Sequence, residues 1–533
     1  MRSRAATLRR ALSERARYES HLRHVEPLLT QRPRIHLFAA VPVVGDAQTR
    51  RHPLALCVDP GQPGATGNTR ASIERQTLRP AQVLEMPLDR ALRETRAPWL
   101  AVVASGTRLA GRALERLAQA VTLAPGAQVF SCDDDIRDVA GRRAHPRLRP
   151  GPSPDHWLEC DPDFACLVVA REPALAALRH GGGDPHGLFL ALSGPAGAGH
   201  AHVPMVLCHT NGPHGLRGGG PEGRAVKDAL SGWETSARVE PAGPRRWRIR
   251  RPLAREPAVE AVVCFRDRPG LLERCARSLL DRSTYERLSL RLVDNGSSDS
   301  EMAALLGRLG RDERVALDSD PRAFNFSALN NAAATRSEAD ILVFLNNDTE
   351  VVDPGWVEVL LEHALRPGVG AVAPLLTYPD GRVQHAGVAL GLNGWAGHPL
   401  AGLAPDAPTP FGSAADGTRN WMAVTGACLM VERHKFEEVG GFDESFAVGG
   451  GDVDLGLRLT AAGYRSLCVP HTRVIHDESM SRDPLAIPAG DFEASRRSYG
   501  TFRTVGDPFY HPSLTLEDSS CRVRRRGEPG PPS

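Results

Sequence analysis

A short apolar run, Ile341–Leu345, passes without a break into five polar residues: Asn346, Asn347, Asp348, Thr349 and Glu350. A run of this length, apolar at every position, predicts a strand buried on both faces of a parallel sheet. In open α/β sheets, ligands bind beyond the carboxyl ends of such strands. We therefore expect two amides and two carboxylates at a ligand-binding edge.

A second strand, predicted over Leu288–Asn295, also ends in polar residues, with Asp294 and Asn295 followed by Gly296 and two serines. Because the carboxyl ends of parallel strands meet at one edge of a sheet, Asp294 is expected near Asp348. Asp-Asn-Gly-Ser is also a common turn sequence, so a purely structural turn is the alternative for this segment.

A third candidate is Gly449–Gly451, followed at once by Asp452 and Asp454. Three glycines let the backbone approach a ligand closely, and the apolar spacing that follows predicts a helix. Two acids two positions apart point to different sides of a helix, so they are not expected to share one role. An N-cap role is the alternative for Asp452.

Strands and helices alternate through this half of the chain, which predicts a parallel sheet flanked by helices. The expected strands are Ala258–Phe265, Leu288–Asn295, Arg314–Asp318 and Ala339–Leu345, and the expected helices lie around Leu271–Leu280, Glu301–Leu309 and Phe326–Thr335. This pattern brings the strand ends named above to one crevice.

Six segments, taken together and in this order, resemble the family 2 glycosyltransferases, and more narrowly the bacterial rhamnosyltransferase-like members that build surface polysaccharides. They are RDRPGLLERCARSLL, LVDNGSSD, FNFSALNNAAA, FLNNDTEVVDPGW, VTGACLMVERHKFEEVGGFDE and GGGDVDLGLRLTAAGY, and the resemblance covers about Ala258 to Pro484. It implies a GT-A fold, a nucleotide-sugar donor, a divalent metal (Mg²⁺ or Mn²⁺) and inversion at the anomeric carbon.

By this resemblance the metal motif falls on Asn346, Asn347 and Asp348, with Asp348 as the carboxylate that faces the metal. Many relatives carry an acid where this chain has Asn346, and an amide supplies no charge. His476, in TRVIHDES, matches a C-terminal histidine that holds the metal or the phosphate. A bound cation would neutralise the diphosphate leaving group.

The resemblance also implies the remaining site residues. Asp452 matches the general base, which takes the proton of the acceptor hydroxyl. Donor-binding roles fall on Asp294, Arg266, Asp267, Asn330, Asn346 and Asn347, and acceptor-side roles on Asp443 and Asp454. Cys264 and Phe265 replace the usual Pro-Thr before Arg266, which leaves the base of the nucleotide open.

The first half resembles a second, degenerate copy of the same domain. RAPWLAVVASGTRLAGRALERLAQAV matches the strand and metal motif, but Ala104, Ser105 and Gly106 stand where acids are expected. Asp184 keeps the place of an acid in DPHGLFLAL. We expect two tandem α/β, GT-A-like domains with mainly parallel sheets, of which the first is inactive; an unrelated α/β domain is the alternative for the first half.

The expected boundaries are a basic helical extension over 1–35, the degenerate domain over 36–240, a Pro- and Arg-rich linker over 241–257, the catalytic domain over 258–500 and a C-terminal tail over 501–533 whose end is disordered. The extension would form either a solvated helix or an amphipathic helix on an anionic membrane surface. No segment has the apolar length of a signal peptide core or a membrane span, so we expect a cytoplasmic protein with at most peripheral contact with the inner face of the membrane.

The 533 residues carry a formal net charge of only +2, which does not indicate a nucleic-acid partner. The ten cysteines include no CxxC pair, which argues against zinc-binding motifs. The predicted partners are a nucleotide-sugar donor and a glycan or lipid-linked glycan acceptor. The rival hypothesis is a non-catalytic nucleotide-sugar-binding scaffold of a polysaccharide assembly complex.

Overall fold

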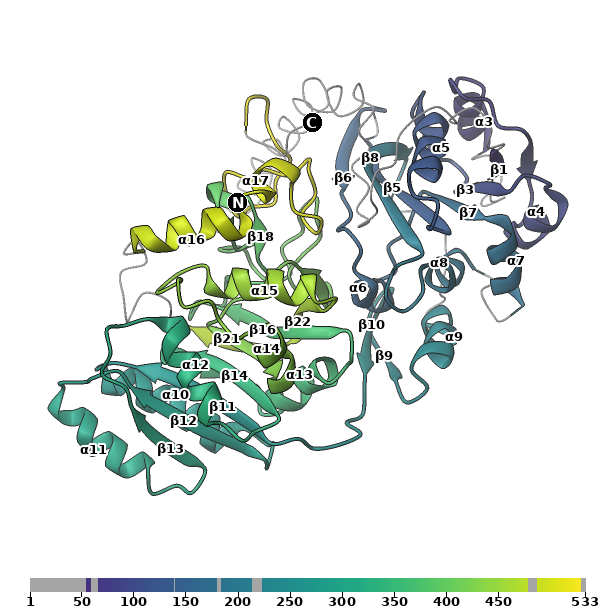
Figure 1. The fold of residues 1–533 in the computed structure, drawn as a ribbon. Coiled ribbons are helices and arrows are strands. Elements are labelled where there is room, and N and C mark those ends of the chain that lie inside the picture. The colour runs from purple at the N-terminus through teal and green to yellow at the C-terminus, as the bar shows by residue number, and fades with distance from the viewer. Residues whose placement is uncertain are drawn as a thin grey trace, which may run out of the picture.

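A computed structural model describes residues 54–58, 66–138, 140–179, 184–212, 223–477 and 487–528. Each half of the chain contains one large mixed β-sheet with helices packed on it (Figure 1). The predicted extension over residues 1–35 lies outside the described ranges. None of the helices in those ranges is both long and apolar enough to span a bilayer.

The second-half sheet has the strand order β13-β12-β11-β14-β21-β16-β22-β15, with β17 added to β16 and β20 to β22. Its strands are β11 (Val259–Phe265), β12 (Leu288–Asp294), β13 (Val315–Ser319), β14 (Ile341–Asn346), β15 (Thr349–Val351), β16 (Val369–Thr377), β17 (Val383–His385), β20 (Arg419–Trp421), β21 (Cys428–Glu432) and β22 (Arg465–His476). Four neighbours, β13, β12, β11 and β14, are parallel, as predicted. A small separate hairpin joins β18 (Ala389–Leu390) to β19 (Ala396–Gly397).

Both faces of this sheet are covered by helices. Accordingly, every residue of β14 before Asn346 is apolar and buried. Val343 joins the core under α10 (Pro269–Arg282), α11 (Ser300–Leu309) and α13 (Trp356–Ala364), whereas Phe344 joins the core on the other face. The helices on that other face are α12 (Phe326–Arg336), α14 (Arg433–Glu438) and α15 (Gly451–Ala461), with α16 (Ala489–Tyr499) packed on α15. Alternate residues of a strand point to opposite faces, which explains the split.

The first-half sheet has the order β2-β1-β3-β7-β5-β8-β4, with β6 added to β5. Its strands are β1 (Leu54–Val58), β2 (Val83–Glu85), β3 (Trp99–Val103), β4 (Arg108–Leu109), β5 (Val129–Arg137), β6 (Arg143–Arg147), β7 (Cys166–Ala170) and β8 (His200–Thr210). Its helices are α3 (Thr66–Ile73), α4 (Leu88–Glu94), α5 (Ala113–Leu123), α6 (Pro154–Glu159), α7 (Arg171–Leu178), α8 (Pro185–Ser193) and α9 (Arg224–Trp233).

The first-half sheet corresponds in strand order to most of the second-half sheet, in which β13 and β20 are additional. The order β2-β1-β3-β7-β5-β8-β4 matches β12-β11-β14-β21-β16-β22-β15. The directions match as well: β3 is parallel to β1 and antiparallel to β7, just as β14 is parallel to β11 and antiparallel to β21. One added strand also has a counterpart, since β6 pairs antiparallel with β5 just as β17 pairs antiparallel with β16. The tandem α/β architecture predicted from the sequence is therefore present. The prediction of mainly parallel sheets is wrong, because antiparallel pairs such as β3–β7 and β14–β21 make both sheets mixed.

The predicted linker over 241–257 is wrong in its first part, where a β-hairpin forms from β9 (Arg238–Gly243) and β10 (Arg246–Arg250). Trp247 and Ile249 alternate with arginines and are 2% and 1% exposed. This is the period-2 pattern of a half-buried strand. The high Arg and Pro content of the segment is typical of a linker, which is why the sequence did not indicate this strand.

Helix α6 joins the two halves of the molecule, and Figure 1 shows it beside the β9–β10 hairpin between the two sheets. Its Asp155 accepts hydrogen bonds from the guanidinium groups of Arg366 and Arg465, the latter at 2.8 Å. Its Glu159 accepts from the backbone N–H of Thr418 at 2.6 Å and lies 2.9 Å from Nε2 of His471. Arg465 and His471 belong to β22, so the first half holds that strand directly.

The prediction of a C-terminal tail over 501–533 is wrong for most of residues 501–528, the part of this range that the structure describes. After the short helix α17 (Phe502–Val505), Tyr510, Leu514 and Cys521 are buried in the core of the second half. His511 reaches the first half, where its Nε2 lies 2.7 Å from Oδ2 of Asp133. The apolar residues here are irregularly spaced among Pro, Arg and Ser, so no periodic pattern indicated a packed segment.

Candidate active site

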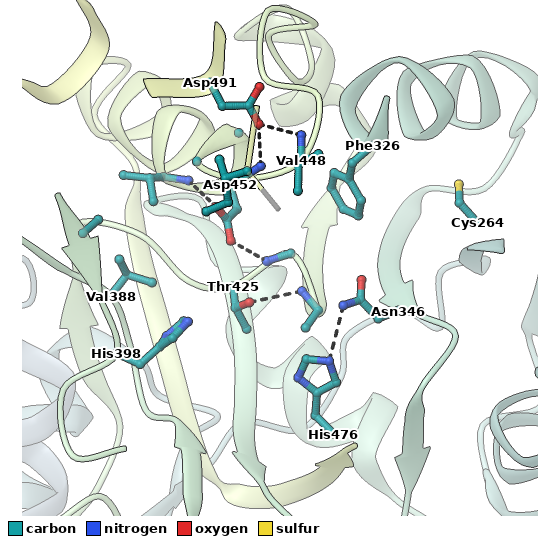
Figure 2. Close-up of a pocket in the computed structure, with 18 of the residues that line it drawn as sticks. Cys264, Phe326, Asn346, Val388, His398, Thr425, Val448, Asp452, His476 and Asp491 are labelled. Carbon is teal, nitrogen blue, oxygen red and sulfur yellow. Dashed lines mark hydrogen bonds between the residues drawn. The ribbon is translucent and has the colours of Figure 1, made fainter. Parts of the chain in front are cut away.

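A pocket of about 800 Å³ opens at the carboxyl ends of β11 and β14, beneath the start of α15. It collects most of the predicted site residues, as Figure 2 shows for three of them, Asn346, Asp452 and His476. The predicted residues that line it are Arg266, Asp267, Asn346, Asn347, Asp348, Asp452 and His476.

At the floor of the pocket, His476 lies beside Asp348. Its Nε2 is 3.2 Å from Oδ1 of Asp348 and 3.4 Å from Nδ2 of Asn346. Both Asp348 and His476 are at least nine-tenths buried, and Nδ1 of His476 has no hydrogen-bond partner in the described part of the chain. A carboxylate oxygen and an imidazole nitrogen that converge in this way suit a divalent cation such as Mn²⁺. The residues present therefore fit the metal that the sequence resemblance implies.

Asp452 lies in the first turn of α15 and enters the pocket from above (Figure 2). Its Oδ2 accepts a hydrogen bond from the backbone N–H of Gly426 at 2.9 Å, and its Oδ1 accepts one from Val453 at 2.9 Å. The residue at the N-cap is Gly450, so the N-cap alternative for Asp452 is wrong. A half-buried carboxylate fixed by two backbone donors is oriented toward the pocket.

The glycine loop before Asp452 is shaped by Asp491, a residue that no sequence motif indicated. Its carboxylate accepts hydrogen bonds from the backbone N–H groups of Ala447, Val448 and Gly449, at 3.0, 2.7 and 2.8 Å. Gly450 has φ 95°, and a Cβ there would lie 2.8 Å from Oη of Tyr499. Only glycine fits this position without strain.

The edge formed by Arg266 and Asp267 follows β11 directly. Asp267 has φ 55° and its Oδ1 accepts hydrogen bonds from the backbone N–H groups of Asp299 and Ser298, at 2.9 and 2.7 Å. These two backbone bonds lower the pKa of the Asp267 carboxyl. Asp267 therefore ties the end of β11 to the loop after β12.

Four predicted site residues do not line the pocket: Asp294, Asn330, Asp443 and Asp454. Asp294 accepts from Ser297 N at 2.8 Å and Asp443 from Ser445 N at 2.9 Å, so each holds a local turn. Asp454 forms an ion pair with Arg458 at 2.7 Å and accepts from Ser498 at 2.6 Å. Asn330 is buried against Cys264, with its Nδ2 bonded to the carbonyl of Phe326.

The pocket also has a wall that the sequence interpretation missed. It includes Val388, Trp395 and His398, and Phe492 of α16 completes it. Behind this wall lies the fully buried His385, whose pKa is held well below its usual value by burial and by His398 and His476. Single aromatic residues in a loop carry no periodic signal, so the sequence did not predict this wall.

Comparison with known proteins bears on this site. A family model described as glycosyl transferase family 2 matches residues 260–431. The chain is 41% identical over 438 residues to the O-antigen biosynthesis protein RfbC of Myxococcus xanthus, which covers 79% of this chain and 34% of that protein. It is 33% identical over 248 residues to the N-acetylglucosaminyl-diphospho-decaprenol L-rhamnosyltransferase of Mycobacterium tuberculosis, covering 42% of this chain and 78% of that protein.

The chain thus spans only about a third of the Myxococcus xanthus protein. Among solved structures, GalNAc-T7 with UDP, GalNAc and Mn²⁺ superposes on 46% of this chain and 48% of its own, at 17% identity and a TM-score of 0.37. A similarity this distant carries no argument about the chemistry of the pocket.

Proposed function

Because the chain belongs to glycosyl transferase family 2, we propose that its second half is an inverting GT-A glycosyltransferase that moves a sugar from a nucleoside diphosphate to a hydroxyl of a growing surface glycan. One observation carries this proposal: the Asp348–His476 pair and Asp452 line the same pocket at the carboxyl ends of the parallel strands. A cation-binding pair and a positioned carboxylate are the two parts that such a transfer needs.

Asp348 and His476 hold the divalent cation in this proposal, with Asn346 beside them. When bound there, the cation would supply positive charge that stabilises the diphosphate leaving group. Asn347 lines the same floor and Arg266 the adjoining edge, where Arg266 offers a second positive charge to the nucleotide. Asp267 fixes that edge through its bonds to Ser298 and Asp299.

Asp452 is the general base. The acceptor oxygen forms a bond to the anomeric carbon, the bond from that carbon to the diphosphate oxygen breaks, and the acceptor proton passes to a carboxylate oxygen of Asp452. Because one displacement occurs, the configuration at the anomeric carbon inverts. The hydrogen bonds from Gly426 and Val453 keep the carboxylate in place while the proton is transferred.

The residues outside the pocket act indirectly in this proposal. Asp294 and Asp443 stabilise turns, Asn330 packs behind Cys264, and Asp454 fixes α15 through Arg458 and Ser498. None of them then contacts donor or acceptor directly. This revises the roles that the sequence resemblance implies for them.

The relatives suggest the substrates. The Mycobacterium tuberculosis relative is named for transferring L-rhamnose to a lipid-linked N-acetylglucosaminyl diphosphate, and the Myxococcus xanthus relative for O-antigen biosynthesis. We extend both to this chain: a nucleoside-diphosphate rhamnose donor and a lipid-linked or polymeric glycan acceptor.

The first half, in the same proposal, is a degenerate copy that retains the sheet and has lost the chemistry. Ala104, Ser105 and Gly106 follow β3, whereas Asn346, Asn347 and Asp348 stand at the end of the corresponding strand β14. No carboxylate remains in that tripeptide to hold a metal. Its role is to support β22 through α6.

A panel of nucleoside diphosphates and their sugars tests the proposal, by thermal shift with and without Mn²⁺, followed by transfer assays with the donor found. A ligand that binds only the native state raises the melting temperature by mass action. We expect a Mn²⁺-dependent shift with one nucleotide and transfer from its sugar to a glycan acceptor. A shift with no transfer to any acceptor pool would instead support the scaffold hypothesis.

A further inference from the structure

One face of helix α16 lines the candidate active site, next to the loop that leads to Asp452. Asp491, Ser495 and Tyr499 are spaced four positions apart, which places them on one face of the helix, and all three line the pocket. Each of these residues is at most 4% exposed. Helix α16 is therefore part of the pocket wall, although it follows the last strand of the sheet.

Asp491 uses both of its carboxylate oxygens on this loop. Oδ1 accepts a hydrogen bond from the backbone N–H of Ala447 at 3.0 Å, and Oδ2 accepts from those of Val448 and Gly449 at 2.7 and 2.8 Å. Figure 2 shows this carboxylate at the top of the pocket, above Asp452. Hydrogen bonds to an ionised acceptor are roughly twice as strong as those between neutral groups. One side chain of α16 therefore holds three successive backbone groups of the loop.

The first turn of α12 holds the same loop through its carbonyl groups. The backbone N–H of Phe326 donates to the carbonyl of Ala447 at 2.8 Å, and Oγ of Ser327 donates to the carbonyl of Phe446 at 2.7 Å. The contact with α12 is close, because a Cβ at Gly451 would lie 2.9 Å from Oγ of Ser327. Residues 446–451 are therefore held by two helices, α12 through carbonyl groups and α16 through N–H groups.

The loop continues directly into the turn of α15 that bears the proposed base. Gly450 has φ 95° and precedes Asp452 by two positions, and a Cβ at Gly450 would lie 3.1 Å from Oγ of Ser495. Oδ2 of Asp452 accepts from the backbone N–H of Gly426 at 2.9 Å, in the loop before β21. A displacement of residues 447–451 would therefore move this carboxylate within the pocket. Misplacement of a reacting group by about 1 Å can lower a rate about 100-fold.

We propose that Asp491 is a positioning residue for Asp452: its carboxylate holds residues 447–451 in the conformation from which the proposed base reaches the acceptor hydroxyl. This inference rests on the proposed function, in which Asp452 takes the proton of that hydroxyl. Both oxygens of Asp491 are bonded to the backbone, so Asp491 acts through the loop and not on the substrate itself. Helix α16 is accordingly a required part of the catalytic unit, and it contributes to proton transfer rather than to nucleotide binding.

The test uses the full chain with Mn²⁺ and the donor that the thermal-shift panel identifies. Asp491→Asn keeps the size of the side chain but replaces one oxygen by an NH₂ group, which cannot accept a hydrogen bond, so at least one of the three backbone bonds is lost. We expect kcat to fall about 20-fold, because the base is misplaced. The Kd of the nucleoside diphosphate, measured by titration calorimetry, and the KM of the donor should stay within about twofold of wild type.

A double-mutant cycle with Asp452→Asn separates positioning of the base from general stability. If Asp491 acts through Asp452, Asp491→Asn should slow the Asp452→Asn enzyme by less than about twofold, against about 20-fold in the wild-type background. A purely structural role would lower the rate by the same factor in both backgrounds. Rates are measured at a temperature at which the melting curves show every variant to be folded.

Two further variants complete the test. Glu362→Gln is the matched control, because Glu362 is 7% exposed and its Oε2 accepts from the backbone N–H of Arg251 at 3.0 Å, outside the pocket. We expect it to lower the melting temperature and leave kcat unchanged. Gly450→Ala displaces the loop without altering Asp491, since its backbone conformation disfavours a side chain. It should reproduce the loss of kcat, the normal nucleotide binding and the non-additivity with Asp452→Asn, and it carries the test if Asp491→Asn does not fold.

The same measurements distinguish failure of this inference from failure of the proposed function. Wild-type kcat in Asp491→Asn, or an equal loss of rate in both backgrounds of the cycle, would overturn the positioning role alone. Loss of nucleotide binding by Asp491→Asn would overturn it as well, since the loop would then serve the donor. Absence of Mn²⁺-dependent nucleotide binding by the wild type, or full activity of Asp452→Asn, would instead overturn the proposed function.

Discussion

Nε2 of His476 lies 3.2 Å from Oδ1 of Asp348 because β22 pairs antiparallel with β15, in a register that sets His476 opposite Thr349. The contact therefore depends on the position of β22 as a whole. That strand is held at its other end by the first half of the molecule, through Asp155 to Arg465 and Glu159 to His471. A residue of the candidate metal pair is thus positioned partly by the first half, in which Ala104, Ser105 and Gly106 replace the metal motif after β3.

Removal of the Asp348 carboxylate should abolish metal-dependent donor binding, because Asn346 and Asn347 cannot replace its charge. We expect Asp348→Ala to lose the Mn²⁺-dependent part of the thermal shift and EDTA to have no further effect on it. Asp380→Ala, at an exposed turn, is the control and should respond to EDTA as the wild type does. Donor affinity that stays the same in Asp348→Ala, with and without EDTA, would show that the metal lies elsewhere.

Asp452→Asn should reduce turnover about 100-fold or more and leave donor binding nearly unchanged, since the amide cannot accept the proton. Asp454→Asn is a matched contrast two residues away. It removes the negative charge that pairs with Arg458 and one of the two oxygens that accept from Arg458 and Ser498, so we expect a lower melting temperature with turnover retained. Initial rates with saturating donor, together with melting curves, distinguish the two variants. An Asp452→Asn enzyme with more than about a tenth of the wild-type rate would not be compatible with a general-base role.

The interface between the halves should make stability depend on pH through Asp155. Burial opposes its ionisation, but the charges of Arg366, Arg465 and Arg251 outweigh burial and hold the pKa of this carboxyl well below its usual value. A carboxyl whose pKa is lower in the folded state contributes stability above the unfolded pKa of about 3.9 and loses it as pH falls below that value.

We therefore expect Asp155→Asn to lower the free energy of unfolding at pH 7 by about 3 kcal/mol, because it leaves buried guanidinium groups without their counter-ion. The difference from wild type should shrink by about 1 kcal/mol between pH 5 and pH 3. Urea unfolding at several pH values measures both numbers, and the exposed Asp281→Asn is the control. A difference that stays constant down to pH 3 would contradict the ionic explanation.

Asp184→Ala tests whether the first half has chemistry of its own. Asp184 is the N-cap of α8, and its carboxylate accepts a hydrogen bond from Gly187 N at 2.9 Å. Loss of this cap should cost about 1 kcal/mol of stability and leave glycosyl transfer unchanged. A well-folded Asp184→Ala protein with much less activity would mean that the first half holds a working site.

Sequence patterns predicted the parts of the site that lie on contiguous motifs. Asp348 and Asp452 each follow a recognisable local signal, a buried strand in one case and a run of glycines in the other, and both line the pocket. Asp294 also follows such a signal, yet its carboxylate is used by the backbone of its own turn. Local sequence cannot show whether a carboxylate lines the pocket or holds its own turn, because the direction of the side chain depends on the neighbouring loops.

Asp491, His385 and Trp395 escaped prediction for a related reason. Asp491 matters through backbone groups of a loop that precedes it by more than forty positions, and His385 through a ring-to-ring hydrogen bond across the hairpin. Each is an isolated polar or aromatic residue with no periodicity around it. The β9–β10 hairpin and the C-terminal segment were missed because a few apolar anchors, such as Trp247 and Leu514, are diluted by Arg and Pro.

The contact between His511 and Asp133 has a consequence for the order in which the two halves of the molecule can pack during synthesis. The two residues are 378 positions apart, and at about 5–20 residues per second the chain needs on the order of 20–80 s to make the second after the first. During that interval Asp133 can contact His202 and the backbone N–H of Arg149, but it cannot yet contact His511. The buried contact of Asp133 with His511 can therefore form only after the first half and most of the second half have been synthesised.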